Sequence, residues 1–273
     1  MVIKHGGRGP AHMSRWSKAA GGSAAFSPAS LFSGNKGGFW VASDAKTWAD
    51  TAGTTPITNG AAVARIDDQS GNGNHLLQAT AGNRPVWASG TNPYALATAA
   101  SGHFMNGTFS ANLTGTAVTG ILAFRYAAST GFARAMTIKG VGPTYGNLDS
   151  FAFMIGDATP TTYFASYNSA SGNAVTPVIG NDIIWVSGLT ATNLSIQVDA
   201  GAPSSNAHGL SPALNSSAFS VFDDPGATNP MGGRFYGGLI IDRALTAGEI
   251  ANCVTYFGAF RAGHFKQGCF NAR

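Results

Sequence analysis

The chain has 273 residues, a formal net charge of +4 and only 10% charged residues, while glycine occurs 37 times. Because charged residues usually make up about a quarter of a globular chain, Ser, Thr, Asn and Gly must cover this surface, as suits a protein outside the cell or packed into an assembly. No apolar run is long enough to span a membrane as a helix, and the length suits one large β-domain or two small domains.

The first 30 residues are basic and rich in glycine. Residues 1–20 hold four basic residues and no acid, so they carry the whole net charge, and the other 12 basic and 12 acidic residues cancel. Such a segment cannot bury enough apolar surface to fold alone, and it lacks the apolar core of a signal peptide. The neutral remainder predicts no nucleic-acid-binding face.

Two interpretations of this arm stay open. It is either a flexible tail or an anchor that becomes ordered against a partner chain, and we favour the anchor. Its partner-binding residues would then be the charged and aromatic ones: Lys4, Arg8, Arg15, Trp16, Lys18 and Phe26.

The stretch Asp67–His75 is dense in Gly and Asn, with Asp and Ser among them. Gly and Asn tolerate left-handed backbone conformations, and Asp and Ser side chains bond to nearby amides. The pattern therefore predicts a tight, ordered turn that leads into a strand. We expect the ring of His75 to cap a backbone group there.

The rest of the chain alternates short apolar runs with turn residues, which predicts an all-β domain of two packed sheets. The expected strands are 38–41, 76–80 with 86–87, 103–109, 117–126, 134–139, 151–155, 162–167, 183–189, 193–198, 219–222 and 234–242. Within residues 117–126, apolar residues recur at every second position, so that face should lie in the core.

One helix is predicted near the C-terminus. Thr246 can cap it, Glu249 stands three residues later as in a capping box, and Ile250, Val254 and Phe257 recur on one side. We expect this helix to pack against the edge of the sandwich. Cys253 and Cys269 are expected to be free thiols, because a protein assembled in the cytoplasm usually keeps its cysteines reduced.

Five blocks of sequence carry a resemblance: Phe39–Asp44, Ala52–Thr58, Asp67–His75, Gln78–Pro85 and Gly233–Ile250. Their order resembles the concanavalin A-like (laminin-G-like) jelly-roll domains of bacteriophage virion proteins. The resemblance implies a two-sheet jelly-roll sandwich over residues 31–262, preceded by the arm at 1–30 and followed by a tail at 263–273. It also implies a virion protein, assembled in the host cytoplasm, with other virion proteins as partners and homo-oligomeric assembly.

Two function classes remain open within this setting. The first is a structural virion component, such as a decoration, fibre or tail-associated protein, that docks by its arm and does not insert into a membrane. The second is a module that recognises a bacterial surface glycan, in which aromatic rings stack on sugar faces. The aromatic residues that could serve this role, each of them also a candidate for the core, are Trp48, Trp87, Tyr145, Tyr163 and Tyr167.

The sequence gives no sign of catalysis. A glycosidase needs two carboxyl groups around the scissile bond, whereas the only Glu of the chain, Glu249, belongs to the capping box. No nucleophile elbow and no His-x-x-x-His spacing occurs. The expectation is therefore that the protein is not an enzyme.

Calcium is the one metal that the residues suggest, and no other cofactor is expected. Ca²⁺ binds oxygen ligands held by a flexible loop, and Asp67, Asp68, Asn72 and Asn74 offer such oxygens within one turn. The alternative, which we favour, is that these side chains brace the turn through hydrogen bonds.

Overall fold

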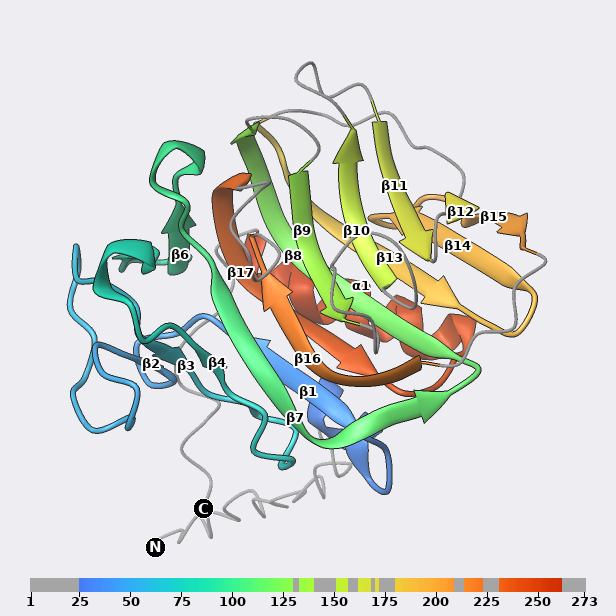
Figure 1. Cartoon of the computed structure of the whole chain (residues 1–273), viewed down its shortest axis with the longest axis horizontal. Helices are drawn as coiled ribbons and strands as arrows, with labels where there is room; N and C mark the ends of the chain where they lie inside the picture. The colour runs from blue at the N-terminus through green and yellow to red at the C-terminus, as the bar shows by residue number, and fades with distance from the viewer. Residues whose placement is uncertain are drawn as a thin grey trace, which may run out of the picture.

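The computed structural model describes residues 25–129, 133–139, 151–156, 162–167, 170–171, 180–208, 214–222 and 231–261. Within these residues the chain forms two antiparallel sheets and one α-helix near the C-terminus (Figure 1). None of the described helices is long and apolar enough to cross a membrane.

Sheet A has eight strands in the described residues, and β1 pairs with β17 beside the main path β15-β14-β13-β8-β17-β6-β5. Its members are β1 (Gly37–Val41), β5 (Val86–Ala88), β6 (Tyr94–Ala97), β8 (Val118–Ser129), β13 (Asp182–Leu189), β14 (Asn193–Val198), β15 (Ser204–Ala207) and β17 (Met231–Ile241).

Sheet B has nine strands in the described residues, in the order β12-β11-β10-β9-β16-β7-β4-β3-β2. Its members are β2 (Thr47–Trp48), β3 (Arg65–Ile66), β4 (Leu76–Leu77), β7 (Met105–Gly115), β9 (Ala133–Lys139), β10 (Phe151–Gly156), β11 (Thr162–Tyr167), β12 (Ala170–Ser171) and β16 (Leu214–Val221). Three short 3-10 helices complete the described elements: η1 (Pro28–Phe32), η2 (Ala81–Asn83) and η3 (Ala99–Ser101).

The two sheets pack face to face over one apolar core. Phe153 of sheet B meets Trp185 of sheet A edge-on, with ring centroids 5.1 Å apart. Phe219 of β16 stacks on Phe109 of β7, and Gly107 leaves the space that the Phe219 ring fills. The predicted all-β architecture of two sheets is confirmed, and the alternating residues of 117–126 do face the core.

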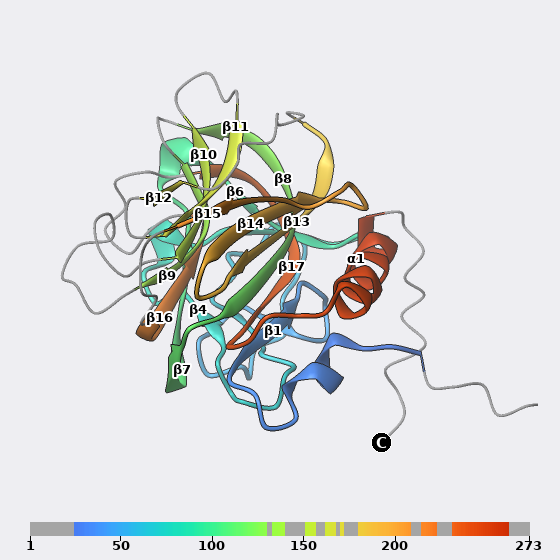
Figure 2. The same ribbon diagram turned by 90° about the vertical axis from the view of Figure 1, so that its right-hand side faces the viewer.

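A second apolar cluster covers the outer face of sheet A. The helix α1 (Ala247–Arg261) lies across this face, opposite to sheet B (Figure 2). Its side chains Cys253, Phe257 and Phe260 are buried against strands β1, β8, β13 and β17. The prediction that the helix packs on the sandwich edge is therefore wrong, because it covers a face. Strand β17 consequently has both faces covered, and ten of its eleven residues are buried.

The predicted capping box is present. The Thr246 hydroxyl accepts a hydrogen bond from the Glu249 backbone N–H, and Glu249 accepts one from the Thr246 N–H. Arg243 adds a two-pronged ion pair to the Glu249 carboxylate at 2.7 Å. Hydrogen bonds from Arg243 and Thr246 lower the pKa of Glu249 to about 2.

The end of the predicted arm contacts the sandwich. Leu31 and Phe32 of η1 are buried in the apolar cluster on the outer face of sheet A, and Phe26 and Ala29 pack against the same cluster. Phe26, which was expected to contact a partner chain, is partly buried against its own domain, and its contact with a partner stays a prediction. The other predicted arm residues, with Tyr145, Cys269 and the tail at 263–273, lie outside the described residues. Cys253 is a free, buried thiol, and burial raises its pKa to about 12.

Candidate functional site

The turn at residues 67–75 connects β3 to β4 at one end of sheet B. Gly71 and Gly73 have φ angles of 92° and 74°, a left-handed conformation that glycine adopts without a steric penalty. The glycines therefore allow the chain to fold back sharply, as the sequence predicted.

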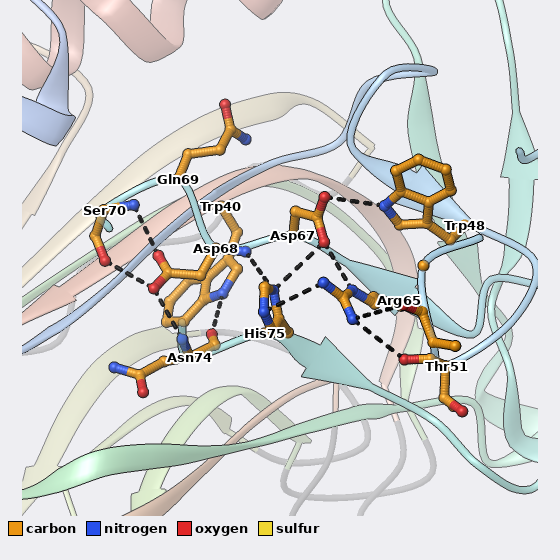
Figure 3. Close-up of polar contacts among 12 residues, drawn as sticks. Trp40, Trp48, Thr51, Arg65, Asp67, Asp68, Gln69, Ser70, Asn74 and His75 are labelled. Carbon is orange, nitrogen blue, oxygen red and sulfur yellow. Dashed lines mark hydrogen bonds and ion pairs between the residues drawn. The ribbon is translucent and has the colours of Figure 1, made fainter. Parts of the chain in front are cut away.

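Asp68 is the centre of this turn (Figure 3). Its Oδ1 accepts hydrogen bonds from the backbone N–H groups of Phe39 and Ser70, both at 2.9 Å. Its Oδ2 accepts from the Ser70 hydroxyl at 2.7 Å and from the Asn74 N–H at 2.9 Å. Four protein donors thus satisfy the carboxylate, and the turn is fastened to strand β1.

The two asparagines extend this network. The Asn74 amide donates to the Gly37 carbonyl at 2.6 Å and accepts from the Ser110 N–H at 2.7 Å, so it joins β1 to β7. The Asn72 amide donates to the carbonyls of Gly37 and Asn35. The buried indole of Trp40 donates to the Asn74 carbonyl at 2.7 Å.

The predicted calcium ligands do not form an open oxygen cage. Asp67 and Asp68 and the Asn74 side chain all accept hydrogen bonds from protein groups. The described residues contain no group of three or more His, Cys, Asp or Glu that could hold a metal. The geometry agrees with the bracing role that we favoured from the sequence.

A second group of side chains lies next to the turn, on the outer face of sheet B. The Asp67 carboxylate accepts hydrogen bonds from Arg65 Nε at 2.7 Å and from Trp48 Nε1 at 3.0 Å. Arg65 also donates to the carbonyls of Ala52 and Thr51. We call Trp48, Arg65, Asp67 and His75 the sheet B corner.

The His75 ring completes the corner. Its Nδ1 accepts from the Asp68 backbone N–H at 3.1 Å, which confirms the predicted capping role, and its Nε2 lies 3.2 Å from Arg65 Nη2. Burial lowers the pKa of His75, and the positive charge of Arg65 lowers it further, although Asp67 and Asp68 act in the opposite direction. The ring is therefore neutral at neutral pH.

The predicted stacking residues separate in the fold. Trp48 is partly exposed at the corner, whereas Trp87 is only 1% exposed and belongs to the core, where its indole donates to Asp44. Trp87 is therefore not available to a sugar, and that assignment was wrong. Tyr163 and Tyr167 lie on β11, at register positions opposite the core residues Ile155 and Phe151. The corner gathers Trp48 and Asp67 with Arg65 and His75, a grouping that the sequence reasoning missed because the residues come from two strands and a turn.

No family model and no curated protein sequence matches the chain. Among solved structures, it is similar to a GH54 α-L-arabinofuranosidase soaked with a cyclic sulfate inhibitor, with a TM-score of 0.56, 16% identity, and coverage of 74% of this chain and 52% of the other. A Trypanosoma rangeli sialidase in complex with 2,3-difluoro-KDN matches with a TM-score of 0.51 at 13% identity, over 82% of this chain and 33% of the sialidase.

A third match covers nearly the whole length of the other chain. Domain 4 of AbnA, a GH43 extracellular arabinanase from Geobacillus stearothermophilus solved with arabinotriose, has a TM-score of 0.53 and 12% identity, over 69% of this chain and 92% of that domain. At these identities the similarity establishes a shared fold. The chain spans about half of the arabinofuranosidase and a third of the sialidase.

These matches correct the prediction that the protein is not an enzyme. That prediction rested on the absence of familiar catalytic motifs. Glycoside hydrolases and sialidases are among the solved structures that share this fold, so the missing motifs do not exclude a carbohydrate-active enzyme.

Proposed function

We propose that the chain is a glycan-binding jelly-roll domain of a bacteriophage virion protein. The observation that carries the binding role is the sheet B corner, where the partly exposed Trp48 indole is held in place by Asp67. Aromatic rings offer large apolar faces with little loss of side-chain freedom, which suits them to stacking on sugar rings. Leu77, the one exposed large apolar side chain among the described residues, lies two strands away on the same sheet.

The solved neighbours support a carbohydrate ligand. The arabinofuranosidase, the sialidase and the arabinanase domain all have names that refer to sugars, and the arabinanase domain was solved with arabinotriose. A fold alone does not assign a ligand. The corner provides the residues through which this chain would use the fold for the same class of ligand.

The virion setting rests on the sequence resemblance. In the structure, the resembling blocks contribute strands β1 and β17 of sheet A, the turn at residues 67–75 and the start of α1. In this proposal the basic arm docks the domain onto other virion proteins, with several copies in each particle. Deleting residues 1–24 should leave a folded domain that no longer enters particles, while normal incorporation would assign docking to the sandwich.

Binding is tested with a panel of neutral and acidic oligosaccharides, measured by isothermal titration calorimetry. Trp48→Ala should weaken binding at least tenfold, and Trp48→Phe should retain most of it, because a flat ring remains. The matched control is Tyr94→Ala, which removes a partly exposed aromatic from sheet A, where its ring lies 4.5 Å from the Arg234 guanidinium carbon. Equal binding by Trp48→Ala and the wild type would contradict the proposal. Release of reducing ends from the oligosaccharides in the same samples would show that the chain hydrolyses glycosidic bonds, as a glycoside hydrolase does.

A further inference from the structure

A row of side chains runs across the outer face of sheet B, at right angles to its strands. The strand register pairs each member directly with the next. Residues paired in this way point to the same side of a sheet. From the middle of the sheet to its edge, the row consists of Ala152, Thr137, Ser220, Asn106, Leu77, Arg65 and Trp48.

The row faces away from the core. Met136 and Ile138, which flank Thr137 along β9, lie in the core between the sheets, as does Phe219, which precedes Ser220. Since successive residues of a strand alternate between faces, Thr137 and Ser220 lie on the opposite side. Figure 1 views this side of sheet B, with sheet A and α1 behind it. The row therefore continues the sheet B corner toward the centre of the outer face.

The members of the row become more buried away from the edge. Leu77 is 37% exposed, whereas Thr137 is 1% exposed and Ser220 is fully buried. The residues between Leu77 and Ala152 are small or polar and carry no charge. At the edge, the charge of Arg65 is balanced by Asp67.

Two atoms of the row are buried without a hydrogen-bond partner. They are the hydroxyl oxygen of Thr137 and the side-chain carbonyl oxygen of Asn106. Buried polar atoms are nearly always paired in native proteins, because an unpaired one loses its bonds to water without replacement. Both atoms belong to the same row and flank Ser220, so a single ligand could satisfy both.

We propose that this row binds the end of a neutral, unbranched glycan chain. The inference rests on the proposed function and specifies its ligand. Thr137 can donate to and accept from sugar hydroxyls, and Asn106 Oδ1 accepts from them. The glycan lies along the row, with its buried end at Thr137 and its outer residues over Leu77 and Trp48. A charged sugar is disfavoured, because a carboxylate near Ser220 would lie among uncharged side chains, and the cation of the row, Arg65, already pairs with Asp67 at its edge.

The test compares Thr137→Val with the wild type in two measurements. Valine has the shape of threonine but lacks the hydroxyl, so it removes the unpaired atom without opening a cavity. The affinity for arabinotriose, xylohexaose or cellohexaose should fall about tenfold, as for the loss of one hydrogen bond. The unfolding midpoint without ligand should stay equal or rise, because an unpaired buried hydroxyl is replaced by a methyl group. Asn106→Ala should weaken binding similarly.

The control is Thr255→Val, on α1 at the opposite side of the molecule, which should leave binding unchanged. If Trp48→Ala loses binding while Thr137→Val and Asn106→Ala retain it, the proposed glycan-binding function stands, and the proposal that the row forms the binding site is refuted. If the wild type binds no probe, both fail. A lower unfolding midpoint for Thr137→Val would show that the Thr137 hydroxyl stabilises the fold. That result would contradict the proposal that the row binds a glycan through this hydroxyl. Tighter binding of trigalacturonate than of the neutral probes would overturn the neutral ligand class.

Discussion

The two outer faces of the sandwich are used differently. The outer face of sheet A is apolar and is covered by η1 and α1, with Phe257 fully buried at the centre of the contact. The outer face of sheet B has small polar side chains, a braced turn at one end and two unpaired buried oxygen atoms. A sheet stabilised by a core on one side can bury its other side for stability, as sheet A does here. In the proposed function, the outer face of sheet B serves recognition instead.

The largest expected effect comes from removing the cover of sheet A. Phe257→Ala should lower the free energy of unfolding by about 3–5 kcal/mol, because it removes a buried aromatic ring and leaves a cavity. The ring contacts Phe39 edge-on at 6.1 Å and lies on the face opposite to sheet B. Urea denaturation measures the loss.

Thr255→Ala, an exposed position on the same helix, should change the free energy of unfolding by less than about 0.5 kcal/mol. Glycan affinity of the folded Phe257→Ala variant should match the wild type. A loss of glycan affinity in Phe257→Ala equal to that in Trp48→Ala would mean that the two outer faces are coupled. It would contradict the view that the two faces have separate roles.

The next effect concerns the braced turn. Asp68→Ala should lower the free energy of unfolding by about 3 kcal/mol, since hydrogen bonds to a charged group contribute about 1.5–3 kcal/mol each and those of one group do not add fully. Asp68→Asn, which keeps the shape but exchanges an acceptor for a donor, should be destabilised less. Thermal unfolding in millimolar Ca²⁺ and in EDTA should give the same midpoint, because protein donors occupy the carboxylate. A calcium-dependent rise that Asp68→Ala abolishes would instead establish a metal site.

The smallest effect is at the start of α1. Glu249→Gln should cost about 1 kcal/mol, the typical contribution of a helix cap with a partly exposed ion pair. The pKa of Glu249 is lowered from 4.5 to about 2 in the folded protein. The ionised form is therefore favoured by folding, and its contribution is complete above pH 4.5 and lost as the pH falls through about 2.

The difference in the free energy of unfolding between the wild type and Glu249→Gln should accordingly shrink as the pH is lowered from 4.5 to about 2. A difference that persists unchanged below pH 2 would show that packing, and not the charge, stabilises the helix start.

Local patterns in the sequence predicted most of the secondary structure. Strand β11 and strand β14 have the predicted ends, and the alternation in residues 117–126 identified the core face of β8. The capping box fixed the start of α1, and the Gly-Asn turn forms as expected. These features depend on residues close in sequence, so their signals are local. Strands β2, β3, β6, β12 and β15 were missed because none is longer than four residues.

The sequence by itself therefore determined the all-β class, the position of the helix and the braced turn. Only the tertiary structure decided which aromatic residues are accessible: Trp48 and Trp87 look alike in sequence, yet one lies at the corner and the other in the core. It also decided that α1 covers a face, and that Thr137, Ser220 and Asn106 stand in one row. Strand register joins residues more than a hundred positions apart, and no local pattern encodes that pairing.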